Sequence, residues 1–175
     1  QEILARIFSP DTQVYEEGMF QAFLACLRSL SVDGRIVVVF ANKQPAAWEA
    51  LVSALIRAGF VAEASSPIQT ERQSRTRAMA SAALASSVWL VCRKRPTIAR
   101  PGWDSVVLRE MYENVTVKLR AFWDAGIRGP DFVWAATGPA LEAYSKHPVV
   151  FKVGSATKEL LGVSEFLREV RRTVV

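Results

Sequence analysis

Residues 33–40 read Asp-Gly-Arg-Ile-Val-Val-Val-Phe, a turn followed by an unbroken run of β-branched and aromatic residues. A strand that is apolar on both faces is typical of a parallel sheet with helices on either side. We therefore expect this run to form an inner strand of a doubly wound α/β sheet, with helices covering both of its faces.

Predicted helices lie on both sides of this strand in the sequence. Apolar residues recur at helical spacing between residues 14 and 30, and again between residues 48 and 56. Pro45 suits the first turn of the second helix, and Gly59 suits the position just past its carboxyl end.

Two more strands are expected at residues 60–65 and 87–92, separated by a long polar loop. Together with the first strand they predict the carboxy-terminal half of a doubly wound, Rossmann-like sheet that ends in a β-hairpin. Half a sheet leaves one edge and one apolar flank uncovered, and Gln1 is not a natural start. We therefore expect upstream sequence to belong to the complete protein.

The remainder of the chain is predicted to be mainly helical. A linker at residues 96–104, marked by prolines and a glycine, separates an α/β part at residues 1–95 from a helical extension at residues 105–175. The last helix is expected at residues 165–170, with Ser164 as its amino-terminal cap.

Composition limits the class of protein. Of the 175 residues, 50% are apolar and 22% are charged, a balance that can bury a core and that argues against disorder. The formal charge of +5 suits a phosphate-backbone partner, although many soluble domains reach it without one. No apolar run approaches the ~20 residues of a membrane span, so we expect a cytoplasmic protein without a membrane partner.

The sequence offers little for catalysis or metal binding. Cys26 and Cys92 are expected to be buried thiols in a reducing compartment, and His147 a surface side chain beside Pro148. So few cysteines and histidines argue against a zinc site within the chain. A glycine-rich phosphate loop, a nucleophile elbow and a paired-histidine motif are also missing. No catalytic residue, cofactor-binding residue or metal ligand is therefore predicted.

The loop between the last two predicted strands is the richest in side chains suited to nucleic acid. Arg72, Arg75 and Arg77 alternate there with amide and hydroxyl side chains. Guanidinium groups bind phosphates or base edges in a planar fork, and amides and hydroxyls read donor and acceptor patterns. A solvated hairpin loop is the alternative, although ordinary hairpin connections are shorter. The basic residues 93–95 are expected to be a solvated strand end.

Four of the five tryptophans lie within apolar periodic segments and are expected in the core: Trp48, Trp89, Trp123 and Trp134. Trp103 follows Gly102 in the predicted linker, and for this residue core and base-stacking roles stay open.

Two sets of segments resemble known proteins. Residues 15–19, 33–43, 47–51 and 58–60 resemble the carboxy-terminal half of an S-adenosylmethionine-dependent methyltransferase domain. Residues 67–71, 82–88, 92–95, 126–131, 138–142 and 144–145 resemble large adenine-specific DNA methylases, which carry an amino-terminal domain of unknown function and are linked to phage defence. The resemblance covers most of the chain, from about Tyr15 to its end.

This resemblance implies methyl transfer from S-adenosylmethionine to an amino nitrogen of a DNA base, adenine N6 or cytosine N4. It also implies that the cofactor loop and the Asp-Pro-Pro-Tyr type motif lie upstream, because neither occurs here. We expect S-adenosylmethionine to bind the parent enzyme and not this chain alone, which we expect to be inactive. The remainder of the methyltransferase is then a partner of this chain.

The resemblance further implies which residues face DNA, the expected macromolecular partner. In this fold the loop between the last two strands lies near the substrate, where an extruded base would sit. That placement gives the DNA-binding candidates Gln69, Thr70, Glu71, Arg72, Arg75 and Arg77. Asn42 and Lys43 would lie at the carboxyl edge of the sheet, where doubly wound folds bind ligands.

A different class of function remains as an alternative. The unfinished sheet edge and apolar flank would also suit a non-catalytic protein-interaction or nucleic-acid-binding module, including a homo-oligomer formed through the sheet. A free-standing enzyme is a third alternative, but no acid–base or nucleophilic constellation can be assembled for it from the sequence.

Overall fold

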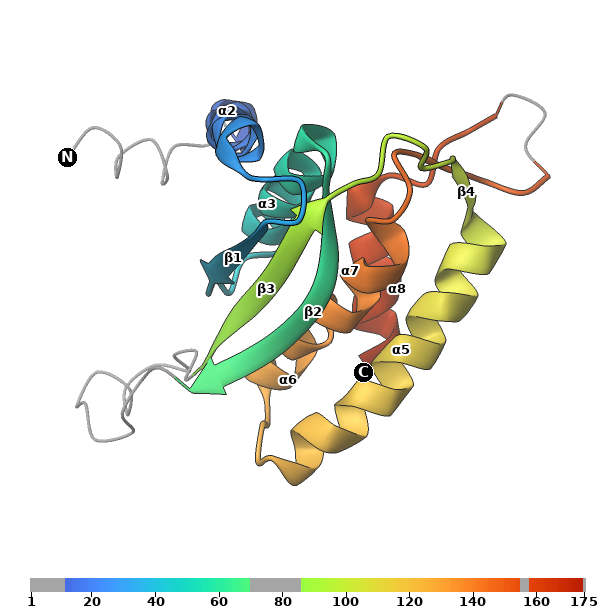
Figure 1. Cartoon of the computed structure of the whole chain (residues 1–175). Coiled ribbons are helices and arrows are strands. Elements are labelled where there is room, and N and C mark those ends of the chain that lie inside the picture. Colours follow the sequence, from blue (N-terminus) through green and yellow to red (C-terminus); the bar gives the residue numbers. More distant parts are fainter. Residues whose placement is uncertain (1–11, 70–85, 155–157, 175) are drawn as a thin grey trace.

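The computed structural model describes residues 12–69, 86–154 and 158–174, which form a mixed α/β fold (Figure 1). A three-stranded sheet contains β1 (Arg35–Phe40), β2 (Phe60–Gln69) and β3 (Ser86–Lys94). A parallel pair joins β4 (Gly102–Trp103) to β5 (Val150–Phe151). The helices are α2 (Thr12–Ser29), α3 (Pro45–Ala58), α5 (Asp104–Asp124), α6 (Pro130–Ala135), α7 (Thr137–Tyr144) and α8 (Val163–Val174).

Local sequence explains both ends of α3. Pro45 stands in its first turn, where the missing N–H costs no helical hydrogen bond. Gly59 follows its last residue with φ of 99°, a left-handed conformation that an L side chain rarely adopts. Both predictions for this helix are confirmed.

The main sheet differs from the expected parallel one. Its order is β1-β3-β2, and β3 runs antiparallel to both neighbours. The β2–β3 hairpin is present, but the described residues contain no Rossmann-like parallel sheet. The strands β1 and β2 therefore run in the same direction without being hydrogen-bonded to one another. A bulge between Ala62 and Ala64 shifts the β2 register by one residue at Glu63.

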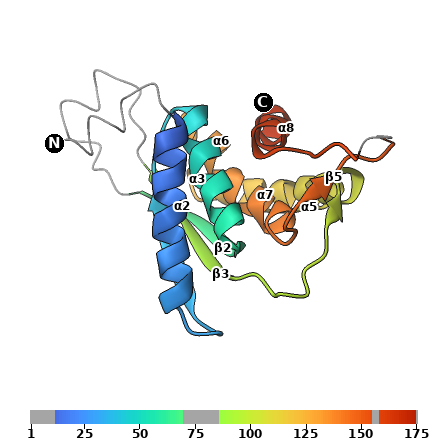
Figure 2. The ribbon, with the colours of Figure 1, turned by 90° about the horizontal axis from the view of Figure 1, so that it is seen from above.

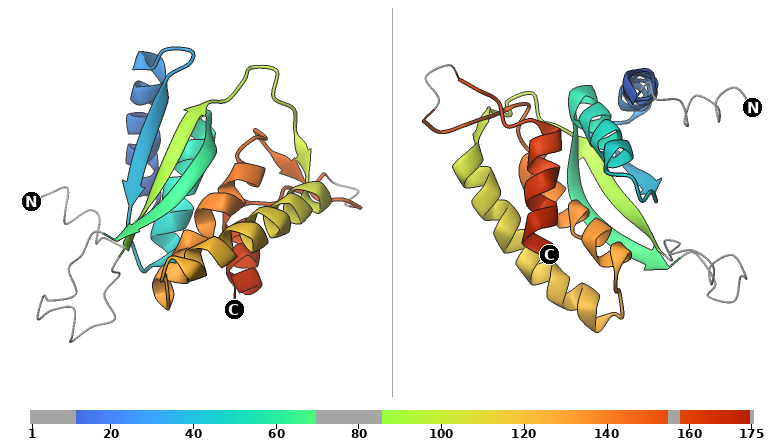
Figure 3. Two further views of the ribbon diagram at one scale, coloured as in Figure 1. Left: turned by 60° about the horizontal axis from the view of Figure 1, so that its bottom comes forward. Right: turned by 180° about the vertical axis from the view of Figure 1, so that it is seen from behind.

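One face of this sheet carries the helices (Figures 2 and 3). On that face Phe40 of β1 meets Trp48 of α3 edge-on at 4.9 Å between ring centroids, and Trp48 stacks on Trp134 of α6 at 5.4 Å. The opposite face is exposed: Val37 and Val39 of β1 keep 53% and 51% of their surface. The expectation of helices on both faces of β1 is therefore wrong for the described residues.

The two edges of the sheet also differ. At the β2 edge the Ala62 N–H donates to Ser145 Oγ at 2.9 Å, and that hydroxyl donates to Leu141 O at 2.6 Å in α7. The carboxyl end of α7 thus satisfies a backbone donor that an edge strand would otherwise leave to solvent. At the other edge, β1 pairs with no strand besides β3 among the described residues.

The carboxy-terminal helices share their core with the sheet. Val107 and Met111 of α5 and Phe166 of α8 belong to the same buried cluster as Trp48 and Leu90. The Tyr144 hydroxyl donates to Leu161 O at 2.6 Å and ties α7 to the segment before α8. The boundaries proposed at residues 96–104 stay a prediction. The described helices include none that is both long and apolar enough to cross a membrane.

Some sequence predictions for single residues are wrong. Ser164 is the second residue of α8, not its cap, because the helix begins at Val163. Trp123 keeps 53% of its surface and stacks under the Arg128 guanidinium at 3.7 Å, and Trp89 keeps 36%. Cys26 is exposed, whereas Cys92 is buried as expected. Trp89 lies on the uncovered sheet face, where periodicity cannot tell whether a partner is present.

Candidate nucleic-acid interface

The carboxyl ends of β1 and β2 meet at one edge of the main sheet, which we call the carboxyl edge (Figure 1). Phe40, the last residue of β1, pairs with Val88, and Gln69, the last residue of β2, pairs with Ser86. Asn42 and Lys43 follow β1 directly, so they share this edge with the end of β2. Of the loop candidates, Thr70, Glu71, Arg72, Arg75 and Arg77 lie outside the described residues.

Asn42 has a structural role at the carboxyl edge. Its Oδ1 accepts the Gln44 N–H at 2.8 Å, and its carbonyl accepts the Trp48 indole N–H at 2.9 Å. These two bonds fix the turn between β1 and α3 and satisfy the polar end of a fully buried tryptophan. Lys43 is exposed at the bend that this turn creates. The structure thus supports Lys43 more than Asn42 as a residue available to an anionic partner.

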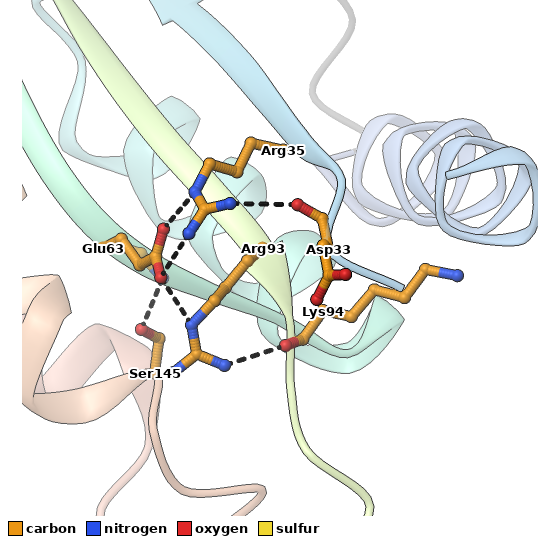
Figure 4. Close-up of polar contacts among 7 residues, drawn as sticks. Asp33, Arg35, Glu63, Arg93, Lys94 and Ser145 are labelled. Carbon is orange, nitrogen blue, oxygen red and sulfur yellow. Dashed lines mark hydrogen bonds and ion pairs between the residues drawn. The ribbon is translucent and has the colours of Figure 1, made fainter. Parts of the chain in front are cut away.

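The other end of the sheet, where β1 and β2 begin and β3 ends, carries a triad of charged side chains, Arg35, Glu63 and Arg93 (Figure 4). Arg35 Nε donates to Glu63 Oε2 at 2.7 Å, and Arg93 Nε lies 2.8 Å from Glu63 Oε1. Arg35 and Arg93 face each other across β1 and β3, while Glu63 reaches them from the bulge in β2. The triad therefore links all three strands on the uncovered face.

Hydrogen bonds within the triad change the pKa of its carboxyl group. The Arg35 hydrogen bond is the main cause that lowers the pKa of Glu63, and the charges of Arg35 and Arg93 act in the same direction. Glu63 is therefore ionised at neutral pH and cannot serve as a general acid there. Two guanidinium groups around one carboxylate leave the triad with a net positive charge.

The basic segment at residues 93–95 is not simply the solvated strand end that was predicted. Arg95 is largely enclosed: its Nε donates to Ser145 O at 3.0 Å, and its Nη2 donates to Ile56 O at 3.0 Å and to Phe60 O at 3.2 Å. Burial lowers the pKa of this guanidinium, which remains charged at neutral pH. Arg95 thus joins α3, β2 and α7 and has a structural role.

The described residues do not assemble a catalytic centre around their perturbed groups. Burial raises the pKa of Cys92 to about 12, which keeps the thiol protonated and unreactive at neutral pH. Burial likewise raises the pKa of Tyr144 to about 12, and its hydroxyl is held by Leu161 O. Within the described ranges, no group of three or more histidine, cysteine, aspartate or glutamate side chains could hold a metal ion.

Trp103 lies apart from the carboxyl edge. It keeps 52% of its surface on β4 and tilts against Phe151 of β5, with 5.9 Å between ring centroids. Nearby, His147 is half-buried and its Nδ1 lies 2.9 Å from Arg100 O. The strand β4, which carries Trp103, lies far from the carboxyl ends of β1 and β2, where the other candidates are found (Figure 1).

No sequence pattern pointed to the triad of Arg35, Glu63 and Arg93. Glu63 is 28 residues from Arg35, and only the strand pairing brings them together. The available sequence signal is weak: Glu63 lies inside one predicted strand, and Arg35 and Arg93 flank two others.

Comparison with known proteins gives no match for this chain: no family model, no curated protein and no solved structure is similar to it at a significant level.

Proposed function

We propose that this chain is the carboxy-terminal part of a DNA amino-methyltransferase, which transfers a methyl group from S-adenosylmethionine to adenine N6 or cytosine N4. In this proposal the chain supplies the last strands of the methyltransferase sheet and a DNA-facing edge. The cofactor loop and the catalytic motif belong to the remainder of the enzyme, so the isolated chain is inactive. The DNA contacts come from Lys43 and from Gln69, Arg72 and Arg75.

The incompleteness of the sheet is the observation that carries this proposal. Helix, strand, helix and hairpin follow one another as α2, β1, α3, β2 and β3, in the succession that the resemblance implies. The β1 edge lacks a second strand among the described residues, and Val37 and Val39 are exposed beside it. An α/β sheet normally buries both faces of such an apolar strand, and further strands and helices of the same enzyme would do so here.

A protein-interaction module is the second candidate, because exposed apolar sheet residues mark binding surfaces in many proteins. The two candidates are compatible if the partner is the remainder of the methyltransferase. They differ in what they predict for the carboxyl edge: only the methyltransferase requires this edge to contact DNA.

The proposal is tested by mapping DNA contacts on the isotope-labelled full chain. We expect a 12-base-pair duplex at low salt to shift the backbone amide resonances of Lys43 and Gln69 at the carboxyl edge. The amides of Arg35 and Arg93, at the opposite edge of the same sheet, serve as the internal control and should not move. Added salt should reverse the shifts, because phosphate contacts release counterions. Shifts confined to the Arg35 and Arg93 edge, or no shifts at all, would reject the proposed interface.

A further inference from the structure

The uncovered face of the main sheet has two chemically distinct parts. Val37 and Val39 of β1 pair with Val91 and Trp89 of β3, so their side chains form an apolar area on that face. Val37, Val39 and Trp89 keep 53%, 51% and 36% of their surface. No described helix lies over this face of β1 and β3 (Figure 3). The triad of Arg35, Glu63 and Arg93 borders this area at the amino end of β1 (Figure 4). We call the apolar area and the triad together the open face.

The size of the open face limits what can bind it. Three strands spaced about 4.8 Å apart and six residues long give a surface of roughly 14 Å by 20 Å, or about 300 Å². A stable dimer needs about 800 Å² from each partner, so two copies of this chain joined through this face alone would be too weakly held. One α-helix, about 10 Å across with its side chains, matches the width. The area therefore favours a single helix over a second copy.

The charge of the open face indicates the chemistry of that helix. Glu63 is shared between Arg35 and Arg93, and both arginines keep solvent-exposed side chains, 53% and 36%. The triad carries one positive charge in excess. An acidic residue near the triad would be attracted to these guanidinium groups, whereas a lysine would be repelled.

We propose that the open face is a docking site for one amphipathic α-helix of a partner segment, with an apolar stripe over Val37, Val39 and Trp89 and an acidic residue beside Arg35 and Arg93. The helix completes the sandwich of helices around the sheet, opposite α2 and α3. The acidic residue sets the position of the helix along the strands, because the apolar area alone has no feature that fixes it. This inference does not depend on the proposed DNA contacts, which lie at the carboxyl edge.

The test uses two synthetic 18-residue amphipathic peptides with the same leucine stripe. One carries glutamates at the end of its polar face, and its matched control carries lysines there. Each is titrated into the isotope-labelled full chain in the absence of DNA. We expect the acidic peptide to shift the amides of Val37, Val39, Trp89 and Val91 and to bind at least fivefold more tightly than the basic peptide.

Variants separate the two parts of the site. Val37→Ser with Val39→Ser should abolish the shifts without unfolding the chain, because both side chains are already half-exposed. The matched control is Val117→Ser on α5, where the valine keeps 71% of its surface and lies elsewhere in the fold. Arg35→Glu with Arg93→Glu should reverse the preference, so that the basic peptide binds more tightly.

Three results would overturn the proposal. The first is an absence of shifts on the open face with both peptides at millimolar concentration. The second is equal affinity for the acidic and basic peptides, which would remove the assigned role of the triad. The third is a concentration-dependent dimer in sedimentation that Val37→Ser with Val39→Ser dissociates, since the occupant would then be a second copy. Failure of the DNA interface would leave all three measurements unchanged, so the two hypotheses fail independently.

Discussion

At the scale of single residues, arginines near one another in the fold serve different purposes. Arg95 is enclosed and gives its donors to three backbone carbonyls, whereas Arg35 and Arg93 share an accessible carboxylate. Sequence alone cannot separate these roles, because Arg93 and Arg95 are two residues apart in the same basic segment. Arg93 lies on the uncovered face of β3, whereas Arg95 follows the end of that strand and binds carbonyls at the ends of α3 and α7 and at the start of β2.

The triad predicts a pH dependence of stability. The pKa of Glu63 is lowered in the folded state, so its contribution to stability is fully present above the pKa of the unfolded state and is lost as the pH falls through the lowered folded value. We expect Glu63→Gln to reduce the free energy of unfolding by about 0.5–1 kcal/mol at pH 7, a range set by the exposure of the pairs. Urea titrations at pH 7 and pH 3 measure the difference.

The control for this prediction is Glu113→Gln, at an exposed position on α5. The destabilisation caused by Glu63→Gln should shrink between pH 7 and pH 3, while the control should change little. A Glu63→Gln effect that is the same at both pH values would mean that the ion pairs do not stabilise the fold.

At the scale of elements, α7 lies so close to β2 that one glycine is needed. A Cβ atom on Gly138 would overlap Ser65 Oγ and Cβ, and Ser65 Oγ is itself buried without a hydrogen-bond partner among the described residues. The close approach lets α7 cover the β2 edge, where Ser145 receives the Ala62 N–H. Because this hydroxyl makes no hydrogen bond with the described residues, replacing Ser65 by a smaller residue should cost little stability.

We predict that Gly138→Ala lowers the free energy of unfolding by about 1–3 kcal/mol, the usual cost of overpacking a tight contact. Ser65→Gly should relieve the overlap, so the double variant should be more stable than the sum of the two single changes predicts. Urea unfolding of the four proteins measures this coupling. Simple additivity of the two changes would show that α7 and β2 do not pack this closely.

Most elements could be predicted from sequence, and the faces they cover could not. Periodicity located α2, α3 and α5, and the β-branched run located β1, because these signals are local. The direction of β3 between β1 and β2 depends on pairing across the long loop, which no local pattern encodes. The apolar run in β1 predicted two buried faces; only one is covered among the described residues, since Val37 and Val39 remain exposed. Asn42 and Lys43 were placed correctly after β1, but the turn made by Asn42 was not foreseen.

At the scale of the whole molecule, the main sheet separates two predicted interfaces. The carboxyl edge, with Lys43 and the end of β2, is the proposed DNA side, and the open face is the proposed site of a partner helix. Helices α2, α3, α6 and α7 occupy the other face, so neither interface interferes with the core (Figure 2). Other segments of a parent enzyme can therefore cover the open face and leave the carboxyl edge accessible to DNA.

The most direct test of the central claim is the salt dependence of duplex DNA binding, measured by fluorescence anisotropy on the full chain. The variant is Arg72→Ala with Arg75→Ala, and the matched control is Arg168→Ala at an exposed position on α8. If both loop arginines contact phosphates, the affinity of the variant for duplex DNA at low salt should be at least about tenfold lower than that of the unmodified chain. Its slope of log affinity against log salt should fall by about 2, while the control should match the unmodified chain. Equal affinities and slopes for all three proteins would contradict the DNA-facing role of this part of the chain.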